Sequence, residues 1–145
     1  MYEQLKLDNQ LCFRLYTASR LITQAYRPLL EPLGITYPQY LVLMVLWEQD
    51  HRPVSEIGHR LGLESNTLTP LLKRMEREQL VVREHSIADG RQTLVSLTAN
   101  GRRLEKQAKD VPACMADCWK GKHIDNTQLG AFISMLDELI ATLKK

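Results

Sequence analysis

The sequence predicts a mainly α-helical fold that carries one small β-hairpin. Over about residues 8–30, 66–79 and 126–143, apolar side chains recur at steps of three and four, which is the spacing of one face of a helix. Residues 80–85 and 93–97 instead form short strand-like runs on either side of an Asp-Gly pair, a strong signal for a hairpin turn. The chain has 145 residues, 44% of them hydrophobic and 25% charged, which is the composition of one average globular domain.

Two helices are expected before residue 48, separated by a turn at Gly34. Asp8 is the expected N-cap of the first helix. Thr36 and Gln39 have the spacing of a capping box at the start of the second. Because residues 36–47 are apolar nearly all round, we expect the second helix to be buried. The apolar face of the first helix consists of Leu11, Leu15, Ala18, Ile22, Ala25 and Leu29.

Two shorter helices follow. The first covers about Val54 to Leu61 and is ended by Gly62, and the second covers about residues 66–79 with Ser65 as its expected cap. Pro70 lies late for a first-turn proline and is expected to bend the start of the second helix. The apolar face of that helix consists of Leu68, Leu71, Leu72 and Met75.

After the hairpin, Thr98 is expected to cap a helix toward Asp110, and Pro112 interrupts it before the last helix. Two short helices joined by a glycine turn and followed by a hairpin are typical of the winged helix-turn-helix. We expect the DNA-binding part at about residues 36–97, within a single domain of residues 1–145. The apolar stripes of residues 1–33 and 98–145 exceed what so small a module can cover, so they either pack on each other or form a dimer interface. We assign both regions as dimerisation helices.

The second helix of the module and the tip of the hairpin carry the candidate DNA contacts. Hydroxyl, amide and cationic side chains suit phosphate and base contacts, and an arginine at a wing tip can enter a minor groove. Asp89 is expected to hold Arg91 through a charge-assisted bond. The alternative is an ordinary solvated helix face and an incidental exposed pair. The candidates are Ser65, Asn66, Thr67, Thr69, Lys73, Arg74, Arg77, Asp89 and Arg91.

Net charge does not identify the ligand. The chain has 19 basic and 17 acidic residues, a balance of +2 that is too small to indicate nucleic-acid binding by itself. Binding therefore depends on geometry and on two copies acting together. A twofold dimer would place two recognition helices about one DNA turn apart and bind a pseudo-palindrome.

The three cysteines, Cys12, Cys114 and Cys118, point to thiol chemistry rather than to structural disulfides. Their number is odd, and no signal peptide or membrane span is visible, so a cytoplasmic protein is expected. The start of a helix would favour a thiolate at Cys12, whereas the alternative is a small buried hydrophobe.

Cys114 and Cys118 share a helix face and are resolving thiols or core positions. With His123 they lack a fourth metal ligand and any zinc-ribbon spacing, so we expect no metal and no cofactor. The sequence also lacks the common enzyme motifs, and its four histidines are scattered.

Four stretches carry a resemblance to a known family. Together they resemble the MarR family of winged-helix repressors over nearly the whole chain, and the first three resemble its organic hydroperoxide resistance regulators. The stretches are residues 7–13 (Leu-Asp-Asn-Gln-Leu-Cys-Phe), 33–40 (Leu-Gly-Ile-Thr-Tyr-Pro-Gln-Tyr), 67–76 (Thr-Leu-Thr-Pro-Leu-Leu-Lys-Arg-Met-Glu) and 89–91 (Asp-Gly-Arg).

The resemblance implies a homodimeric repressor that senses organic hydroperoxides through Cys12 and then releases a pseudo-palindromic operator. It places Tyr16, Tyr26 and Tyr37 in the sensing pocket, for which the alternative is core packing. It also implies that Cys118, or else Cys114, resolves the oxidised Cys12, unless an external thiol does so.

Two other functions stay open at this stage. One is a MarR-type regulator of a small aromatic acid, drug or metal, in which Cys12 is incidental. The other is a thiol peroxidase with no role at DNA, which the predicted recognition helix and wing argue against.

Overall fold

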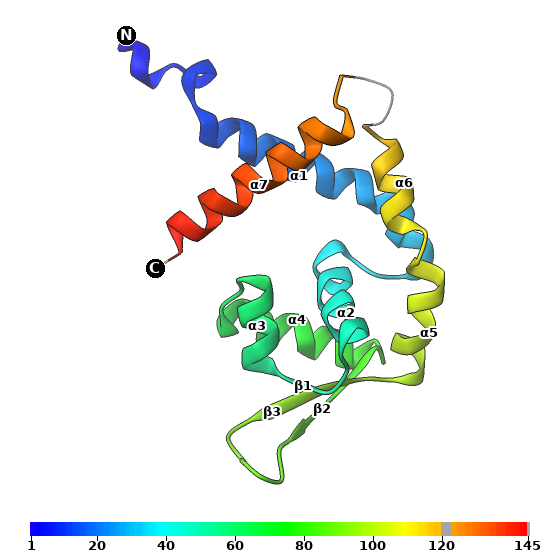
Figure 1. Ribbon diagram of the computed structural model, residues 1–145. Coiled ribbons are helices and arrows are strands. Elements are labelled where there is room, and N and C mark those ends of the chain that lie inside the picture. The colour runs from blue at the N-terminus through cyan, green and yellow to red at the C-terminus, as the bar shows by residue number, and fades with distance from the viewer. Residues whose placement is uncertain (120–122, 145) are drawn as a thin grey trace. The chain divides into compact units, whose positions relative to one another are not determined.

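The computed structural model describes residues 1–119 and 123–144 and confirms a mainly helical fold with a small antiparallel sheet (Figure 1). The chain divides into two compact units, one from Met1 to Lys109 and one from Asp110 onward. The assignment of residues 1–145 to a single domain stays a prediction.

The first unit begins with two 3-10 turns, Glu3–Leu5 and Leu7–Asn9, followed by helix α1, Leu11–Leu30. The predicted cap at Asp8 is wrong, because Asp8 lies in the second 3-10 turn and Gln10 occupies the N-cap position without a side-chain bond to the helix. The Gln10 amide instead donates to the carbonyls of Gln4 and Lys6, at 2.8 and 2.9 Å, and so binds the two turns together.

Helix α2, Tyr37–Glu48, follows a third 3-10 turn, Glu31–Leu33, and a left-handed residue at Gly34. Its capping box is confirmed: Thr36 Oγ1 accepts from the Gln39 backbone N, and Gln39 Oε1 accepts from the Thr36 backbone N. Such a box contributes about 1 kcal/mol. The expected burial is also confirmed, since Gln39, Tyr40, Val42, Leu43, Val45 and Leu46 are all buried.

Helices α3, Val54–Leu61, and α4, Ser65–Arg77, form the helix-turn-helix. Gly62 ends α3 with φ 67°, a left-handed conformation that glycine adopts without strain. The predicted cap at Ser65 is wrong by one residue, since Ser65 is the first residue of α4 and Glu64 precedes it.

The sheet has three strands, β1 (Arg52–Pro53), β2 (Val81–His85) and β3 (Thr93–Leu97), in the order β1-β3-β2. The predicted hairpin is confirmed: β2 pairs antiparallel with β3, with Val81 opposite Leu97 and His85 opposite Thr93. Figure 1 shows the hairpin extending away from the helices as a wing. Sequence reasoning missed β1, because two residues that include a proline carry no strand pattern.

Three further helices complete the chain: α5 (Ala99–Ala108), α6 (Val111–Asp117) and α7 (Asn126–Leu143). The predicted cap at Thr98 is confirmed, since its Oγ1 accepts from the Gly101 backbone N at 3.1 Å. Pro112 lies in the first turn of α6, which follows the predicted interruption. The Asp125 carboxylate and the Gln128 amide form a capping box at the start of α7.

Burial is unequal among the helices. The core lies around α2, α4 and the sheet, whereas α1 buries only Leu30 and α7 has no buried residue. Large apolar side chains are exposed on both: Leu11, Phe13, Tyr16, Leu21 and Ile22 on α1, and Phe132, Ile133, Met135, Ile140 and Leu143 on α7.

Within the described residues, no single helix is long and apolar enough to cross a membrane. Residues Leu11–Leu33 and Tyr37–Glu48 meet that criterion only as a pair, bent by 70°.

Candidate functional site

Helix α4 separates an apolar face from a polar one. Leu68, Leu72 and Met75 are buried in the core and fix the orientation of the helix. Thr69 is half-buried. Lys73, Arg74 and Arg77 make no ion pair with any described residue, so their charges are available to a ligand. The exposed polar residues of this face are Ser65, Asn66, Thr67, Lys73, Arg74 and Arg77.

The wing tip presents one free guanidinium. Asp89 Oδ1 accepts a hydrogen bond from the Arg91 backbone N at 3.1 Å, and the Gln92 backbone N donates to the Asp89 carbonyl at 2.9 Å. The expected bond between Asp89 and Arg91 therefore forms through the Arg91 backbone. The exposed Arg91 side chain has no partner among the described residues, so a phosphate or a groove can bind it.

A carboxylate that sequence reasoning missed joins the wing to α4. Glu76 Oε2 accepts from the Arg83 backbone N at 3.0 Å, and Glu76 Oε1 lies 3.1 Å from Arg83 Nη2. These two bonds, together with the Arg83 charge, hold the pKa of Glu76 below its usual range. Helix and wing are thereby held in one fixed relation.

Acid is expected to weaken this attachment. Because the pKa of Glu76 is lowered in the folded chain, its contribution to the free energy of unfolding is present above the ordinary glutamate pKa and is lost as the pH falls through the lowered value. Thermal unfolding of wild type and Glu76→Gln measures the effect. The wild type is expected to unfold at the higher temperature near about pH 6, and the two curves to converge near about pH 3. A constant difference across that range would contradict the assignment.

Cys12 is the second residue of α1 and is exposed in the single chain, so the alternative of a buried hydrophobe is wrong for this chain taken alone. The exposed thiol at the start of α1 is accessible to small molecules.

Two of the three predicted pocket tyrosines lie together. The rings of Tyr26, on α1, and Tyr37, on α2, have centroids 4.7 Å apart, and Tyr40 lies 5.8 Å from Tyr26 and 6.3 Å from Tyr37. Tyr16 is 68% exposed and makes no ring contact with the described residues. Sequence reasoning missed Tyr40, although its position one turn after Tyr37 signals a shared helix face.

The phenols of this cluster stay protonated at neutral pH. Burial, above all, raises the pKa values of Tyr26, Tyr37 and Tyr40, and the neighbouring phenols raise those of Tyr26 and Tyr40 further. A cavity of about 310 Å³ opens beside Tyr37, between α1 and the start of α2, and its lining includes Thr23, Arg27 and Leu30. The cluster therefore supplies O–H donors and aromatic surface close to a cavity.

Alkaline titration tests the tyrosine environment. Phenolate absorbance of the folded chain is expected to show tyrosines that ionise above the ordinary value of 10.0. Because the pKa values are raised in the folded chain, the contribution of the cluster to stability is complete below the ordinary tyrosine pKa. It is lost as the pH rises through the raised pKa of the folded state. The variant Tyr26→Phe is expected to remove one of the late-ionising groups. Titration of every tyrosine at the ordinary value would contradict the burial of the cluster.

The C-terminal cysteines lie together at the end of α6. Cys118 is its C-cap, and its Sγ donates to the Cys114 carbonyl at 3.7 Å. Both thiols are exposed. Within residues 1–119 and 123–144, no group of three or more potential metal ligands is present.

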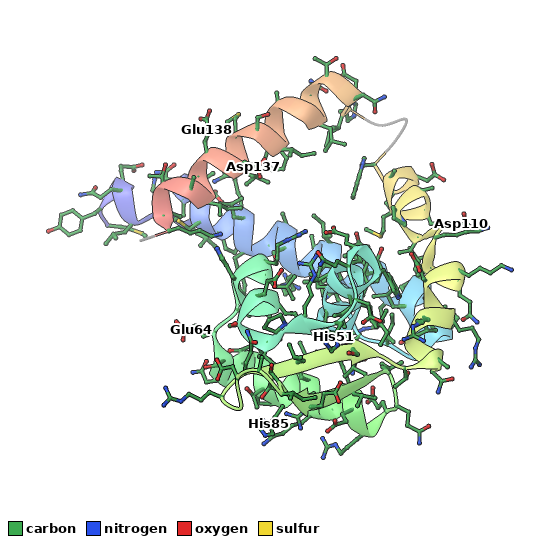
Figure 2. All side chains as sticks on the ribbon, turned by 60° about the horizontal axis from the view of Figure 1, so that its bottom comes forward. His51, Glu64, His85, Asp110, Asp137 and Glu138 are labelled. Carbon is green, nitrogen blue, oxygen red and sulfur yellow. The ribbon has the colours of Figure 1, made fainter. Side chains whose placement is uncertain are left out.

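The histidines show no catalytic pairing in the described chain. His51 contacts Ser96, with Nδ1 and Oγ 2.7 Å apart, and Figure 2 shows His51 well separated from His85 at the end of β2. Glu64, which precedes α4, lies at the outer edge of the same unit in that view.

Comparison with known proteins gives a consistent picture. Residues 24–108 match the family model "Transcriptional regulator SarA/Rot". The chain is 45% identical to the organic hydroperoxide resistance transcriptional regulator of Bacillus subtilis (strain 168), over 95% of each chain. Two similar solved structures are of AbfR, a protein of Staphylococcus epidermidis. Reduced AbfR bound to DNA is 38% identical to this chain, with a TM-score of 0.79 over 98% of each chain. Disulfide-formed AbfR is 40% identical, with a TM-score of 0.65 over 95% of each chain.

Proposed function

Because the chain belongs to the MarR family of winged-helix transcriptional regulators, in its branch of organic hydroperoxide resistance regulators, we propose that it is a repressor that releases DNA when an organic hydroperoxide oxidises Cys12. The observation that carries this proposal is the exposed Cys12 thiol at the start of α1, in a chain that also presents unpaired cations on α4 and the wing. The chain is a regulator and not an enzyme, so a thiol peroxidase is set aside.

DNA binding uses α4 in the major groove and Arg91 in the adjacent minor groove. The hydroxyl and amide groups of Ser65, Asn66, Thr67 and Thr69 serve base edges and phosphates, and the cations farther along α4 serve phosphates. The exposed apolar faces of α1 and α7 pair in a homodimer, so two modules bind the halves of a pseudo-palindrome. Because the protein binds chromosomal DNA, we expect it to act in the cytoplasm.

Sensing starts with attack of the Cys12 thiolate on one oxygen of the hydroperoxide. The O–O bond breaks, the alkoxide leaves and takes up a proton to become an alcohol, and Cys12 becomes a sulfenic acid. Cys12 and Tyr26 are 14 positions apart on α1, about 21 Å along the helix, so the thiol of one chain would meet the tyrosine cluster of its partner in the dimer. There the cluster binds the polar head through its O–H groups while the cavity beside Tyr37 accommodates the alkyl part. Tyr16, which is exposed in the single chain, completes the pocket in the dimer.

A second thiol then resolves the sulfenic acid. Its thiolate attacks the Cys12 sulfur, an S–S bond forms as the S–O bond breaks, and the hydroxide that leaves takes up a proton to become water. Cys118 of the partner chain is our first choice for this thiol and Cys114 the second, because both are exposed and adjacent. A solved structure of disulfide-formed AbfR supports such a step in a relative of this chain. Oxidation respaces the two recognition helices, and DNA is released because both half-sites must fit at once.

The experiment that tests this function is DNA binding before and after oxidation. Operator-like DNA is selected from a random pool with the reduced protein, at one stated salt concentration. Limiting cumene hydroperoxide is expected to release it and a dithiol to restore binding. Binding that survives stoichiometric oxidation of Cys12, measured by mass spectrometry, would overturn the proposal.

A second candidate effector is a small aromatic acid in the same cavity. The observation that favours it is the lining of the 310 Å³ cavity, which combines the Arg27 cation with the Tyr37 ring. Salicylate is the probe for this candidate, because release by salicylate from a protein without a reactive Cys12 would mark this alternative as the operating one.

A further inference from the structure

The first turn of α2 is bonded directly to the C-terminal end of the recognition helix α4. Gln39 Nε2 donates to Glu78 Oε2 at 2.9 Å, and the two residues are 39 positions apart in the chain. Gln39 is the third residue of α2, and Glu78 is the C-cap of α4. One side-chain hydrogen bond therefore connects the helix that carries Tyr37 and Tyr40 to the helix proposed to read DNA.

The Gln39 side chain is held at both ends of its amide group. The residue is 1% exposed, and its Oε1 is already used by the Thr36 backbone N in the capping box. A buried amide N–H requires an acceptor, and the only acceptor that the described residues offer it is Glu78. A displacement of the first turn of α2 is therefore expected to move Glu78 or to break this part-buried hydrogen bond.

Glu78 lies where its own helix does not favour a negative charge. A carboxylate at a helix C-terminus is unfavourable for that helix, because the terminal carbonyls carry partial negative charge. The hydrogen bond that Glu78 Oε2 accepts from Gln39 Nε2 on α2 offsets this cost. Glu78 is therefore held by a contact with α2 in addition to its place at the end of α4.

The far side of this junction is rigid. Thr98 Oγ1 donates to the Gln79 carbonyl at 2.6 Å and lies 3.1 Å from the Leu80 carbonyl. A Cβ built on Gly101 would lie 2.4 Å from the Leu80 oxygen, so the α5 backbone is pressed against this turn. These contacts hold the turn that follows Glu78. A displacement of Glu78 is therefore expected to move the end of α4 rather than to be absorbed by a flexible loop.

The first turn of α2 contacts both the tyrosine cluster and the recognition helix. Tyr37 stacks on Tyr26 beside the cavity, and two residues later Gln39 bonds to α4. The tyrosine cluster and the recognition helix are therefore joined through one turn of α2 and one part-buried hydrogen bond.

We propose that Gln39 is a positioning residue that couples the state of the sensing pocket to the recognition helix through its hydrogen bond to Glu78. This inference rests on the proposed function, in which oxidation of Cys12 releases DNA. Gln39 contacts neither peroxide nor DNA in this role. It determines how strongly the oxidation state of the protein changes the affinity for DNA.

The variant Glu78→Ala isolates the bond, because it removes the acceptor and leaves the capping box intact. Its matched control is Glu78→Gln, which keeps an acceptor oxygen, and Glu105→Ala on α5 removes one exposed negative charge elsewhere. The readout is the ratio of operator affinities of the reduced and the peroxide-treated protein. We expect the ratio to fall about fivefold or more in Glu78→Ala and to stay within about twofold of wild type in both controls.

A merely structural role would give a different result. It would lower the unfolding temperature of Glu78→Ala and leave the affinity ratio unchanged, which would overturn the inference. The rate of Cys12 oxidation, followed by mass spectrometry, is expected to be the same in all variants. If the wild type itself showed no loss of affinity after oxidation, the proposed function would fail first, and that outcome is visible in the same experiment.

An exchange of the two side chains keeps the test decisive if Glu78→Ala does not fold. Gln39→Glu alone places two carboxylates opposite each other and is expected to reduce the ratio. Gln39→Glu combined with Glu78→Gln restores one donor and one acceptor, and a carboxylate at this position still closes a capping box. Recovery of the wild-type ratio in the double variant is the expected result. A double variant that binds DNA when reduced but shows no recovery would refute the coupling.

Discussion

Replacing Cys12 by serine is expected to abolish the response to organic hydroperoxide while operator binding by the reduced protein stays within about twofold of wild type. A serine hydroxyl has nearly the shape of the thiol, but it does not ionise near neutral pH and does not attack an O–O bond. Cys12 is exposed and belongs to α1 rather than to α4 or the wing, so the change is expected to remove the thiol without removing a proposed DNA contact. Titration of labelled operator with Cys12→Ser, before and after limiting cumene hydroperoxide, measures both properties.

The C-terminal thiols supply the controls for this prediction. Cys114→Ser and Cys118→Ser are each expected to form the sulfenic acid at Cys12, and only the variant that lacks the resolving thiol is expected to lose the disulfide-linked dimer on a non-reducing gel. The prediction fails if Cys12→Ser releases DNA as readily as wild type. The effector would then act without Cys12, and the aromatic-acid alternative would take its place.

The elements that the sequence predicted well are those specified by neighbouring residues. The capping box of α2 joins Thr36 to a residue three positions away, and the wing follows from an Asp-Gly pair between two strand-like runs. The bounds of α7, Asn126–Leu143, follow from its apolar period. Where a longer-range contact decides the local structure, prediction was wrong: the Gln10 amide bonds across two 3-10 turns and displaces the cap expected at Asp8.

The candidate site divides in the same way. The exposed cations of α4 could be predicted, because a helical period separates them from Leu68, Leu72 and Met75. The bonds that orient the site could not, since Glu76 on α4 meets Arg83 on β2 across a turn and Gln39 meets Glu78 across 39 residues. No local pattern marks such pairs, and a single sequence holds no record of which distant residues meet. Cys12 was predicted from the stretch of sequence that resembles the family, and the structure adds that its thiol is exposed.

The apolar surface of α7 indicates how the protein recognises DNA with so little net charge. Helix α7 has 18 residues, none of them buried, and several of its exposed side chains are large and apolar. Such a surface would lower the solubility of the protein unless another surface covered it. With a balance of only +2, one module cannot rely on general attraction to phosphate, so affinity must come from two modules held together. Dimerisation is therefore part of the recognition mechanism that we propose, and in that proposal oxidation acts on the spacing that the dimer sets.

Placing a charge on this surface is accordingly expected to have the second large effect. Ile133 is half exposed on α7, and Ile133→Glu would bury a carboxylate in an apolar dimer interface. We expect this variant to be monomeric in analytical ultracentrifugation and to lose about 100-fold or more in operator affinity, because the second half-site contact is no longer intramolecular. Thr127→Glu is the matched control, since an acidic residue in the first turn of α7 suits the helix N-terminus. A monomeric Ile133→Glu that bound the operator as tightly as wild type would show that one module suffices, and the release mechanism based on respaced recognition helices would then be wrong.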